Sequence, residues 1–285
     1  MIWSFYFKNV KKLMFLPIIV FILCVLILGY NIHTTGYLIQ RDIELSGGKL
    51  LSIITTDNVK ITDVENVLKS ENIKDVNVRI ASSVASPKRT ILIQMPEGVD
   101  EKKIIEKLNF ITIEDYSIKQ VGAALGKIFW HQTKLAIFFA FVLMAVVVLL
   151  LFRTIVPSTA VVFAAVADIT ITITILSLIG VKLSLPILAA LLMLIGYSID
   201  TDILLTSKLL KGSGTREEKL KAAIKTGLTM SCTTLAAISV LYLVTSNIVL
   251  KQIAMVLLFG LLTDIPTTWL TNVGILLRFL GEKND

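Results

Sequence analysis

The chain has 285 residues, of which 55% are hydrophobic and 17% are charged, and its mean hydropathy is +0.80. A water-soluble protein carries about a quarter charged residues and cannot bury this much apolar surface, so the composition excludes an ordinary soluble domain and favours a membrane protein in contact with a lipid bilayer. The net charge of +7 does not indicate nucleic-acid binding, because the Lys and Arg residues cluster beside apolar stretches, where they set topology.

Six stretches are apolar and long enough to cross a membrane as helices of about 20 residues. They are predicted at residues 13–32, 135–152, 157–180, 183 to about 206, 226–245 and 252 to about 277. Lys and Arg residues gather at both termini and between the fourth and fifth stretches, which six spans place on one side. The positive-inside rule therefore predicts a multi-pass protein of the cell membrane with both termini cytoplasmic.

The spans divide the chain into three predicted regions. Residues 1–32 form a cytoplasmic N-terminus and the first transmembrane helix, and residues 33–130 form an extracytoplasmic α+β domain. Residues 131–285 form a five-helix transmembrane bundle with a cytoplasmic loop at 207–225. The fold class expected is a polytopic α-helical membrane protein, with six transmembrane helices in a 1+5 arrangement around the inserted domain.

The predicted extracytoplasmic domain alternates short strands with two helices. Strands are predicted at 49–55, 76–81, 90–95 and 113–120, and helices at 62–70 and 100–108. Thr62 is expected to cap the first helix, with Glu65 completing a capping box. The order βαββαβ predicts a ferredoxin-like antiparallel sheet with two helices on one face. These segments contain no cysteine or histidine, so a binding or positioning role is expected instead of catalysis.

Acidic residues inside the predicted spans are the main signal of mechanism. Asp168 and Asp264 lie near the middle of the third and sixth spans, and no Lys or Arg lies deep in any span. A charge at that depth is costly, so such carboxylates face a protein interior and favour the protonated form, which suits a proton or ion relay. In the alternative interpretation these polar groups only hold helices together. The candidate relay residues are Asp168, Asp200, Asp202, Asp264, Thr267 and Thr268.

The two aspartates of the fourth span cannot act alike. Asp200 and Asp202 are two residues apart, which is about 200° around an α-helix, so they face different neighbours. Gly196 and Tyr197 share the side of Asp200, whereas Ser198 shares the side of Asp202. The spacing leaves open which of the two carboxylates is functional.

Nothing in the sequence indicates a metal site or a cofactor. The two cysteines, Cys24 and Cys232, lie far apart in apolar stretches and have no histidine beside them. The glycines at 212 and 214 stand in a short turn-like segment that lacks the spacing of a phosphate-binding loop.

Two short motifs stand at the entry and the exit of the extracytoplasmic domain, and two more lie within the third and fourth spans. They are Asp42-Ile-Glu-Leu-Ser-Gly47-Gly48, Val121-Gly122-Ala-Ala-Leu-Gly126, Ala167-Asp168 and Gly196-Tyr197-Ser198-Ile-Asp200-Thr-Asp202. In these motifs and in its 1+5 layout the chain resembles the archaeal type of SecF, in the SecD/SecF protein-export family. Bacterial members of that family read G-Y-S-x-N-D-T in the fourth motif, so the acidic residues stand at different places here.

The resemblance implies a fold related to the RND superfamily and a function in protein export. It implies a SecD-type companion subunit and assistance to a polypeptide translocating through a SecY-type channel, driven by the proton or sodium motive force. Half of an RND-like exporter of small molecules is the alternative, although such exporters have two six-span halves. An intramembrane aspartyl protease is a further rival, but its G-x-G-D motif is absent, so no enzyme is expected.

Overall fold

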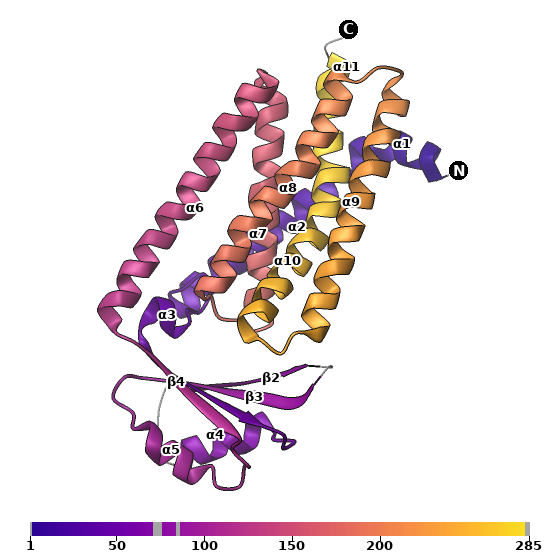
Figure 1. Ribbon diagram of the computed structural model, residues 1–285. Coiled ribbons are helices and arrows are strands. Elements are labelled where there is room, and N and C mark those ends of the chain that lie inside the picture. The colour runs from indigo at the N-terminus through magenta and orange to yellow at the C-terminus, as the bar shows by residue number, and fades with distance from the viewer. Residues whose placement is uncertain (1, 71–75, 84–85, 283–285) are drawn as a thin grey trace.

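The computed structural model describes residues 2–70, 76–83 and 86–282, and it shows a helical bundle with a small sheet domain at one end (Figure 1). Within these residues six helical stretches are long and apolar enough to cross a membrane, which confirms the prediction of a six-span, multi-pass protein. They are Asn9–Thr35, Ala123–Phe152, Ile155–Leu178, Leu185–Lys211, Arg216–Val244 and Ile248–Gly281.

The bundle has a buried centre and an exposed periphery. Its helices are α1 (Ile2–Leu13), α2 (Phe15–Thr35), α6 (Ala123–Phe152), α7 (Ile155–Leu178), α8 (Leu185–Lys211), α9 (Arg216–Val244), α10 (Ile248–Pro266), the π-helix η1 (Thr267–Asn272) and α11 (Val273–Glu282). Helices α7 and α8 bury about half of their apolar stretch, whereas α6 and α9 expose most of theirs. Those exposed apolar surfaces face lipid or another chain.

The last span changes its helical pitch after Pro266. Proline has no amide hydrogen, so it removes one backbone hydrogen bond from α10, and the next six residues form η1. A π-helical turn holds more residues than an α-helical turn and shifts the following side chains around the axis. The buried polar side chains of η1 are those of Thr267, Thr268, Thr271 and Asn272.

Between α2 and α6 lies a four-stranded antiparallel sheet with the order β2-β3-β1-β4, which is the ferredoxin-like order that the sequence predicts. Its region contains α3 (Ile43–Ser46), β1 (Gly48–Thr55), α4 (Ile61–Ser70), β2 (Asn77–Ser83), β3 (Ser86–Met95), α5 (Glu101–Lys107) and β4 (Asp115–Val121). Leu51, Ile53 and Ile91 belong to the buried cluster between the sheet and its two helices. Both helices cover the face that points away from the bundle, so the other face lies toward the membrane helices (Figure 1).

The first helix of the sheet domain begins one residue earlier than predicted. Helix α4 starts at Ile61, so Thr62 lies inside the first turn, where its hydroxyl is 3.4 Å from Asp63 Oδ1. Thr62 is therefore not the N-cap, because a capping residue precedes the first helical residue.

The segment expected as a loop at 207–225 is mostly helical. Helix α8 continues to Lys211 and α9 begins at Arg216. Thr215 and Glu218 form a full capping box, in which each side chain accepts a hydrogen bond from the other residue's amide. This cap and the basic residues that end α8 extend both helices beyond the apolar stretches that hydropathy detects.

Where the chain passes between the bundle and the sheet domain, the backbone after α3 lies directly against the backbone at the start of α6. Gly47 and Gly48, which join α3 to β1, have φ angles of 84° and 129°. A Cβ atom on Gly47 would lie 2.7 Å from Cα of Ala123, and one on Gly126 would lie 2.8 Å from the amide nitrogen of Gly47. Only glycine permits this approach, so these motif residues fix where the domain meets α6.

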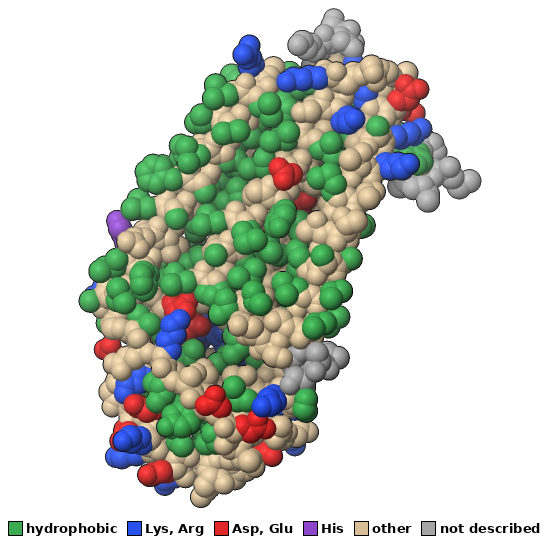
Figure 2. Space-filling model, viewed as in Figure 1, with side chains coloured by type: hydrophobic (Ala, Val, Ile, Leu, Met, Phe, Trp, Pro, Cys, Tyr) green, Lys and Arg blue, Asp and Glu red, His purple; other side chains and the backbone are tan. Residues whose placement is uncertain are grey.

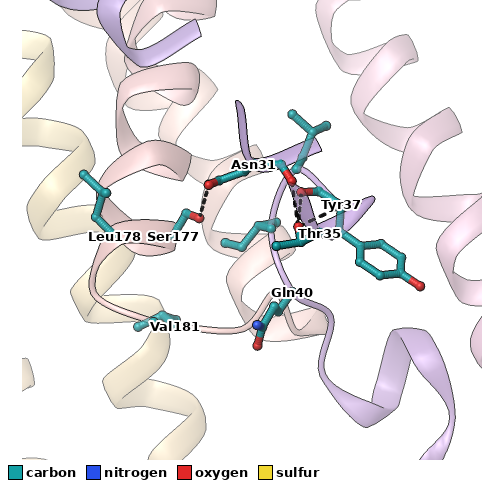
Figure 3. A pocket seen from close by; sticks show the side chains of 10 residues that line it. Asn31, Thr35, Tyr37, Gln40, Ser177, Leu178 and Val181 are labelled. Carbon is teal, nitrogen blue, oxygen red and sulfur yellow. Dashed lines mark hydrogen bonds between the residues drawn. The ribbon is translucent and has the colours of Figure 1, made fainter. Parts of the chain in front are cut away.

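The ends of α2 and α7 nearest the sheet domain meet beside an uncharged pocket (Figure 3). Asn31 Nδ2 donates to Ser177 Oγ at 3.1 Å, and Thr35 Oγ1 donates to the Asn31 carbonyl at 2.7 Å. The pocket has a volume of about 280 Å³ and no Lys, Arg, Asp or Glu among its described lining residues. Just beyond it, the Asp42 amide donates to the Leu183 carbonyl at 2.8 Å, which ties the sheet domain to the loop between α7 and α8.

Candidate functional site

Three aspartates meet in the interior of the bundle. Asp168 of α7, Asp202 of α8 and Asp264 of α10 come from three helices that pack against one another, and all three residues are 0% exposed. Gly260 allows α10 to approach α8 closely, which brings the aspartates together. A Cβ atom at this position would lie only 2.4 Å from a methyl carbon of Leu194 in α8.

Asp168 is held between α8 and the π-helix. Ser198 Oγ donates to Asp168 Oδ2 at 2.6 Å, and the Thr267 hydroxyl donates to Asp168 Oδ1. One turn along α7, Thr172 donates to the backbone carbonyl of Asp168 at 2.6 Å, and its hydroxyl lies 3.5 Å from that of Thr263. Ser198 is thus a direct partner of a buried carboxylate as well as a residue of the fourth motif.

Asp264 and Asp202 share one hydroxyl group. Thr268 Oγ1 lies 3.2 Å from Asp264 Oδ1 and 2.9 Å from Asp202 Oδ1. Thr201 Oγ1 donates to Asp264 Oδ2 at 3.1 Å, and Asn272 Nδ2 donates to Asp202 Oδ1 at 2.7 Å. A hydroxyl both donates and accepts, so Thr268 can accept from one protonated carboxyl group while it donates to the other carboxylate.

The network contains acids and no bases. Within the described part of the chain, no Lys, Arg or His bonds to these three carboxylates, and no group of His, Cys, Asp and Glu is arranged to hold a metal ion. Neighbouring charges in apolar surroundings are costly, so the three aspartates are not all ionised together and the network shares at least one proton. Within the network, Asp202 Oδ2 and Asn272 Oδ1 are buried and have no partner among the described residues.

Asp200 lies outside this network. It is exposed on the surface of α8, together with Tyr197 and Gly196, and a Cβ atom on Gly196 would meet nothing within 4 Å. Ser198 and Asp202, on the opposite side of the same helix, are fully buried. The predicted separation of the two faces is therefore a separation between interior and surface.

Two members of the network were not identified from the sequence. Thr201 stands three residues after Ser198 and donates to its carbonyl at 2.8 Å, so spacing along α8 could have indicated it. Asn272 lies eight residues after Asp264, and it reaches Asp202 from the end of η1, a π-helix that an α-helical count does not anticipate.

The remaining motif residues lie at the junction between the sheet domain and the bundle. Val121 ends β4 and pairs with Gly48 of β1, and Gly122 is the N-cap residue of α6. Together with the contact between Gly47 and Gly126, they position the domain and take no part in the carboxylate network.

These features define a six-span membrane protein with an inserted ferredoxin-like domain, and that fold is found in a solved structure. The crystal structure of SecDF from Thermus thermophilus, a translocon-associated membrane protein, matches 97% of this chain with a TM-score of 0.76 at 20% identity. This chain covers 38% of the length of that SecDF chain. A second crystal structure, of SecDF in a super-membrane-facing form, matches with a TM-score of 0.55.

The chain belongs to the SecD/SecF family of protein-export membrane proteins. Residues 100–282 match the family model described as protein export membrane protein SecD/SecF, C-terminal. Protein-export membrane protein SecF of Methanothermobacter thermautotrophicus is 38% identical over 97% of this chain and 95% of its own length. The SecF of Pyrococcus furiosus is 37% identical over 96% and 92%, respectively, so the family resemblance seen in the sequence is confirmed.

Proposed function

We propose that the protein assists protein export as the SecF-type subunit of a SecD/SecF pair, and that it moves protons or sodium ions through the carboxylate network while a polypeptide crosses a SecY-type channel. Relatives that span nearly the whole chain are named protein-export membrane proteins. The observation that carries the ion-coupling part is the Thr268 hydroxyl shared by Asp202 and Asp264, which bond to no Lys, Arg or His among the described residues.

In this proposal a proton moves by exchange of hydrogen-bond roles. Asp202 takes up a proton at its unpartnered Oδ2, and rotation of the carboxyl group brings that proton to the Thr268 oxygen. As the Thr268 oxygen accepts it, the Thr268 hydroxyl gives its own hydrogen to Asp264 Oδ1, and rotation of the hydroxyl then resets the pair. Thr267 joins Asp264 to Asp168, because its hydroxyl donates to Asp168 Oδ1 and lies 3.0 Å from the backbone carbonyl oxygen of Asp264. Transfer from Asp264 to Asp168 then moves the proton onto α7, one helical turn from Thr172.

A link from α8 to the sheet domain supports coupling between ion movement and the outer domain. Glu44 Oε2, in α3, accepts a hydrogen bond from the Leu185 amide at 2.8 Å, at the first residue of α8. Glu44 also pairs with Lys119 of β4. Because the charge on Asp202 changes the packing of α8 in the interior, a shift of α8 is transmitted to α3 and to the sheet.

The exposed face of α8 supports the proposal of a companion subunit. Met193, Tyr197 and Asp200 are exposed there, and Figure 2 shows acidic atoms within the apolar surface of the bundle. A carboxylate that faces lipid is costly, so a SecD-type helix with polar groups is proposed to cover this face.

Co-purification from native membranes tests the companion. We expect a six-span partner in a one-to-one ratio with the wild-type chain, and loss of that partner in Tyr197→Ala/Asp200→Ala. The matched control is Leu150→Ala, at an exposed position of α6. A monomer that supports full gradient-driven export in reconstituted vesicles would contradict the proposal.

Replacement of the buried carboxylates tests ion coupling. Asp168→Asn and Asp264→Asn keep the size of the side chain but cannot release a proton, so gradient-driven late translocation should stop while the protein stays folded. Protein level and melting in detergent are the controls. Normal coupling in both variants would leave the carboxylates a structural role, and gradient-driven efflux of a small molecule with unchanged export would favour the exporter alternative.

The proposed orientation places both termini and the turn between α8 and α9 in the cytoplasm of a cell membrane. Its support is the Lys and Arg residues at both termini and on the helix ends that flank that turn. A cysteine introduced at Ser213 should resist an impermeant thiol reagent in intact cells, whereas one at Ser117 in β4 should react. Reaction at Ser213 in intact cells would reverse the orientation.

A further inference from the structure

A cationic groove lies between the sheet and the ends of the membrane helices. It has a volume of about 270 Å³ and is lined by β2, β3, α9, α10 and the loop before α8. Its polar lining residues are Arg79, Ser82, Tyr242, Lys251 and Gln252, and its apolar lining residues are Ile80, Ala81, Leu92, Val181, Ile248 and Met255. The described lining therefore carries two cations and no carboxylate.

Arg79 is the least satisfied charged group of the groove. Its Nε donates to Asn77 Oδ1 at 3.1 Å, whereas its Nη2 is buried and has no hydrogen-bond partner in the described structure. Burial lowers the pKa of the Arg79 guanidinium, and the nearby Asp42 offsets this effect only in part. A buried cation with an unused donor is costly unless an anion pairs with it.

Lys251 is held at the other side of the groove by the sheet and by an aromatic ring. Its Nζ donates to the Ser82 carbonyl and lies 5.2 Å from the centre of the Tyr242 ring. It has no carboxylate partner among the described residues, and Arg79 forms no salt bridge there either. Asp42 acts on Arg79 only from outside the groove lining.

We propose that this groove binds the phosphate headgroup of an anionic phospholipid, with the phosphate between Arg79 and Lys251. The groove lies where α9 ends at Val244 and α10 begins at Ile248, which is the depth of the headgroups if these helices span the bilayer. Arg and Lys pair strongly with phosphate oxygens, and a tyrosine is typical of the membrane interface.

The apolar wall of the groove favours a lipid over an ion in solution. Val181, Ile248 and Met255 line the bundle side. The groove is smaller than the roughly 300–1,000 Å³ of pockets that enclose a drug-sized molecule, so it holds a headgroup while the acyl chains remain in the bilayer. The uncharged pocket beside Asn31 and Ser177 lacks this charge complementarity (Figure 3).

Native mass spectrometry of the full chain in detergent, with added phosphatidylglycerol or phosphatidylcholine, tests the proposal. We expect the wild type to bind phosphatidylglycerol at least about tenfold more tightly, because both lipids carry a phosphate but the choline cation of phosphatidylcholine is repelled by Arg79 and Lys251. Arg79→Gln/Lys251→Gln should remove that preference. The control Lys102→Gln/Lys103→Gln removes two exposed charges from α5, on the far face of the sheet, and should keep it.

A charge-retaining variant and two competitors distinguish lipid binding from misfolding and from binding of a soluble anion. Arg79→Lys/Lys251→Arg retains both charges and should retain a preference for phosphatidylglycerol even if the glutamine variant folds poorly. Equal binding of the two lipids by the wild type, or an unchanged preference in a folded glutamine variant, would overturn the proposal. Displacement of the lipid by millimolar inorganic phosphate or by a poly-glutamate peptide would overturn the assignment to a lipid and point to a soluble oxyanion or an acidic polypeptide.

Discussion

The bundle interior and the groove between the sheet and the membrane helices both hold ionisable groups, but those groups have opposite kinds of partners. In the interior, three aspartates meet hydroxyl and amide groups that can reverse their hydrogen bonds, and no described cation fixes them. In the groove, Arg79 and Lys251 donate to an amide oxygen and a carbonyl that can only accept. The first arrangement suits a proton that moves, and the second suits an anion that stays.

The largest expected effect separates the two aspartates of α8. Asp202→Asn should lower gradient-driven translocation in vesicles by at least about 100-fold, because the buried carboxylate would no longer cycle between protonated and ionised states. Asp200→Asn should leave ion coupling through the network unchanged, since Asp200 lies on the exposed face of the same helix.

As a control, the amount of companion subunit bound to each variant must equal that of the wild type. Asp200 lies on the proposed contact surface, so loss of the companion could otherwise be mistaken for loss of ion coupling. Equal loss of coupling in Asp200→Asn and Asp202→Asn, with the companion still bound, would show that burial does not mark the relay.

A smaller effect is expected where the two regions are joined. Gly126→Ala places a Cβ atom 2.8 Å from the backbone nitrogen of Gly47, and overpacking of this kind costs about 1–3 kcal/mol. The thermal midpoint in detergent should fall accordingly. Gly29→Ala in α2 is the matched control, since nothing lies within 4 Å of its Cβ, and it should not destabilise the chain. Equal midpoints for the two variants would mean that the backbone contact is not tight.

The smallest expected effect is a pH dependence at the sheet–bundle interface. Lys182 Nζ donates to Gln94 Oε1 at 2.5 Å, and burial, followed by repulsion from Arg79, lowers the pKa of Lys182 from 10.5 to about 8. Between these two values the unfolded chain holds a proton that the folded chain has released, so stability rises with pH across that window.

Melting in phospholipid-free detergent measures this contribution. Relative to Lys182→Met, the wild type should gain stability as the pH rises from 8 toward 10.5 and show a constant difference below pH 8. Parallel curves for the two proteins over the whole range would exclude Lys182 as the titrating group.

Local patterns in the sequence predicted most of the architecture. Apolar length identified the six spans, and the alternation of strands and helices identified the ferredoxin-like order of the sheet. Local signals failed where polar groups extend a helix, as in the capping box of Thr215 and Glu218, because hydropathy detects only the apolar part of a span.

The sequence by itself determined that carboxylates lie within the spans and that Asp200 and Asp202 face different sides of one helix, because both follow from hydropathy and helical spacing. Only the tertiary structure decided which groups meet. Thr268 and Asp202 are 66 residues apart, and Asn272 reaches Asp202 from a π-helix that no α-helical count anticipates. Local patterns fix the direction of a side chain along its own helix, whereas its partners depend on how separate helices pack.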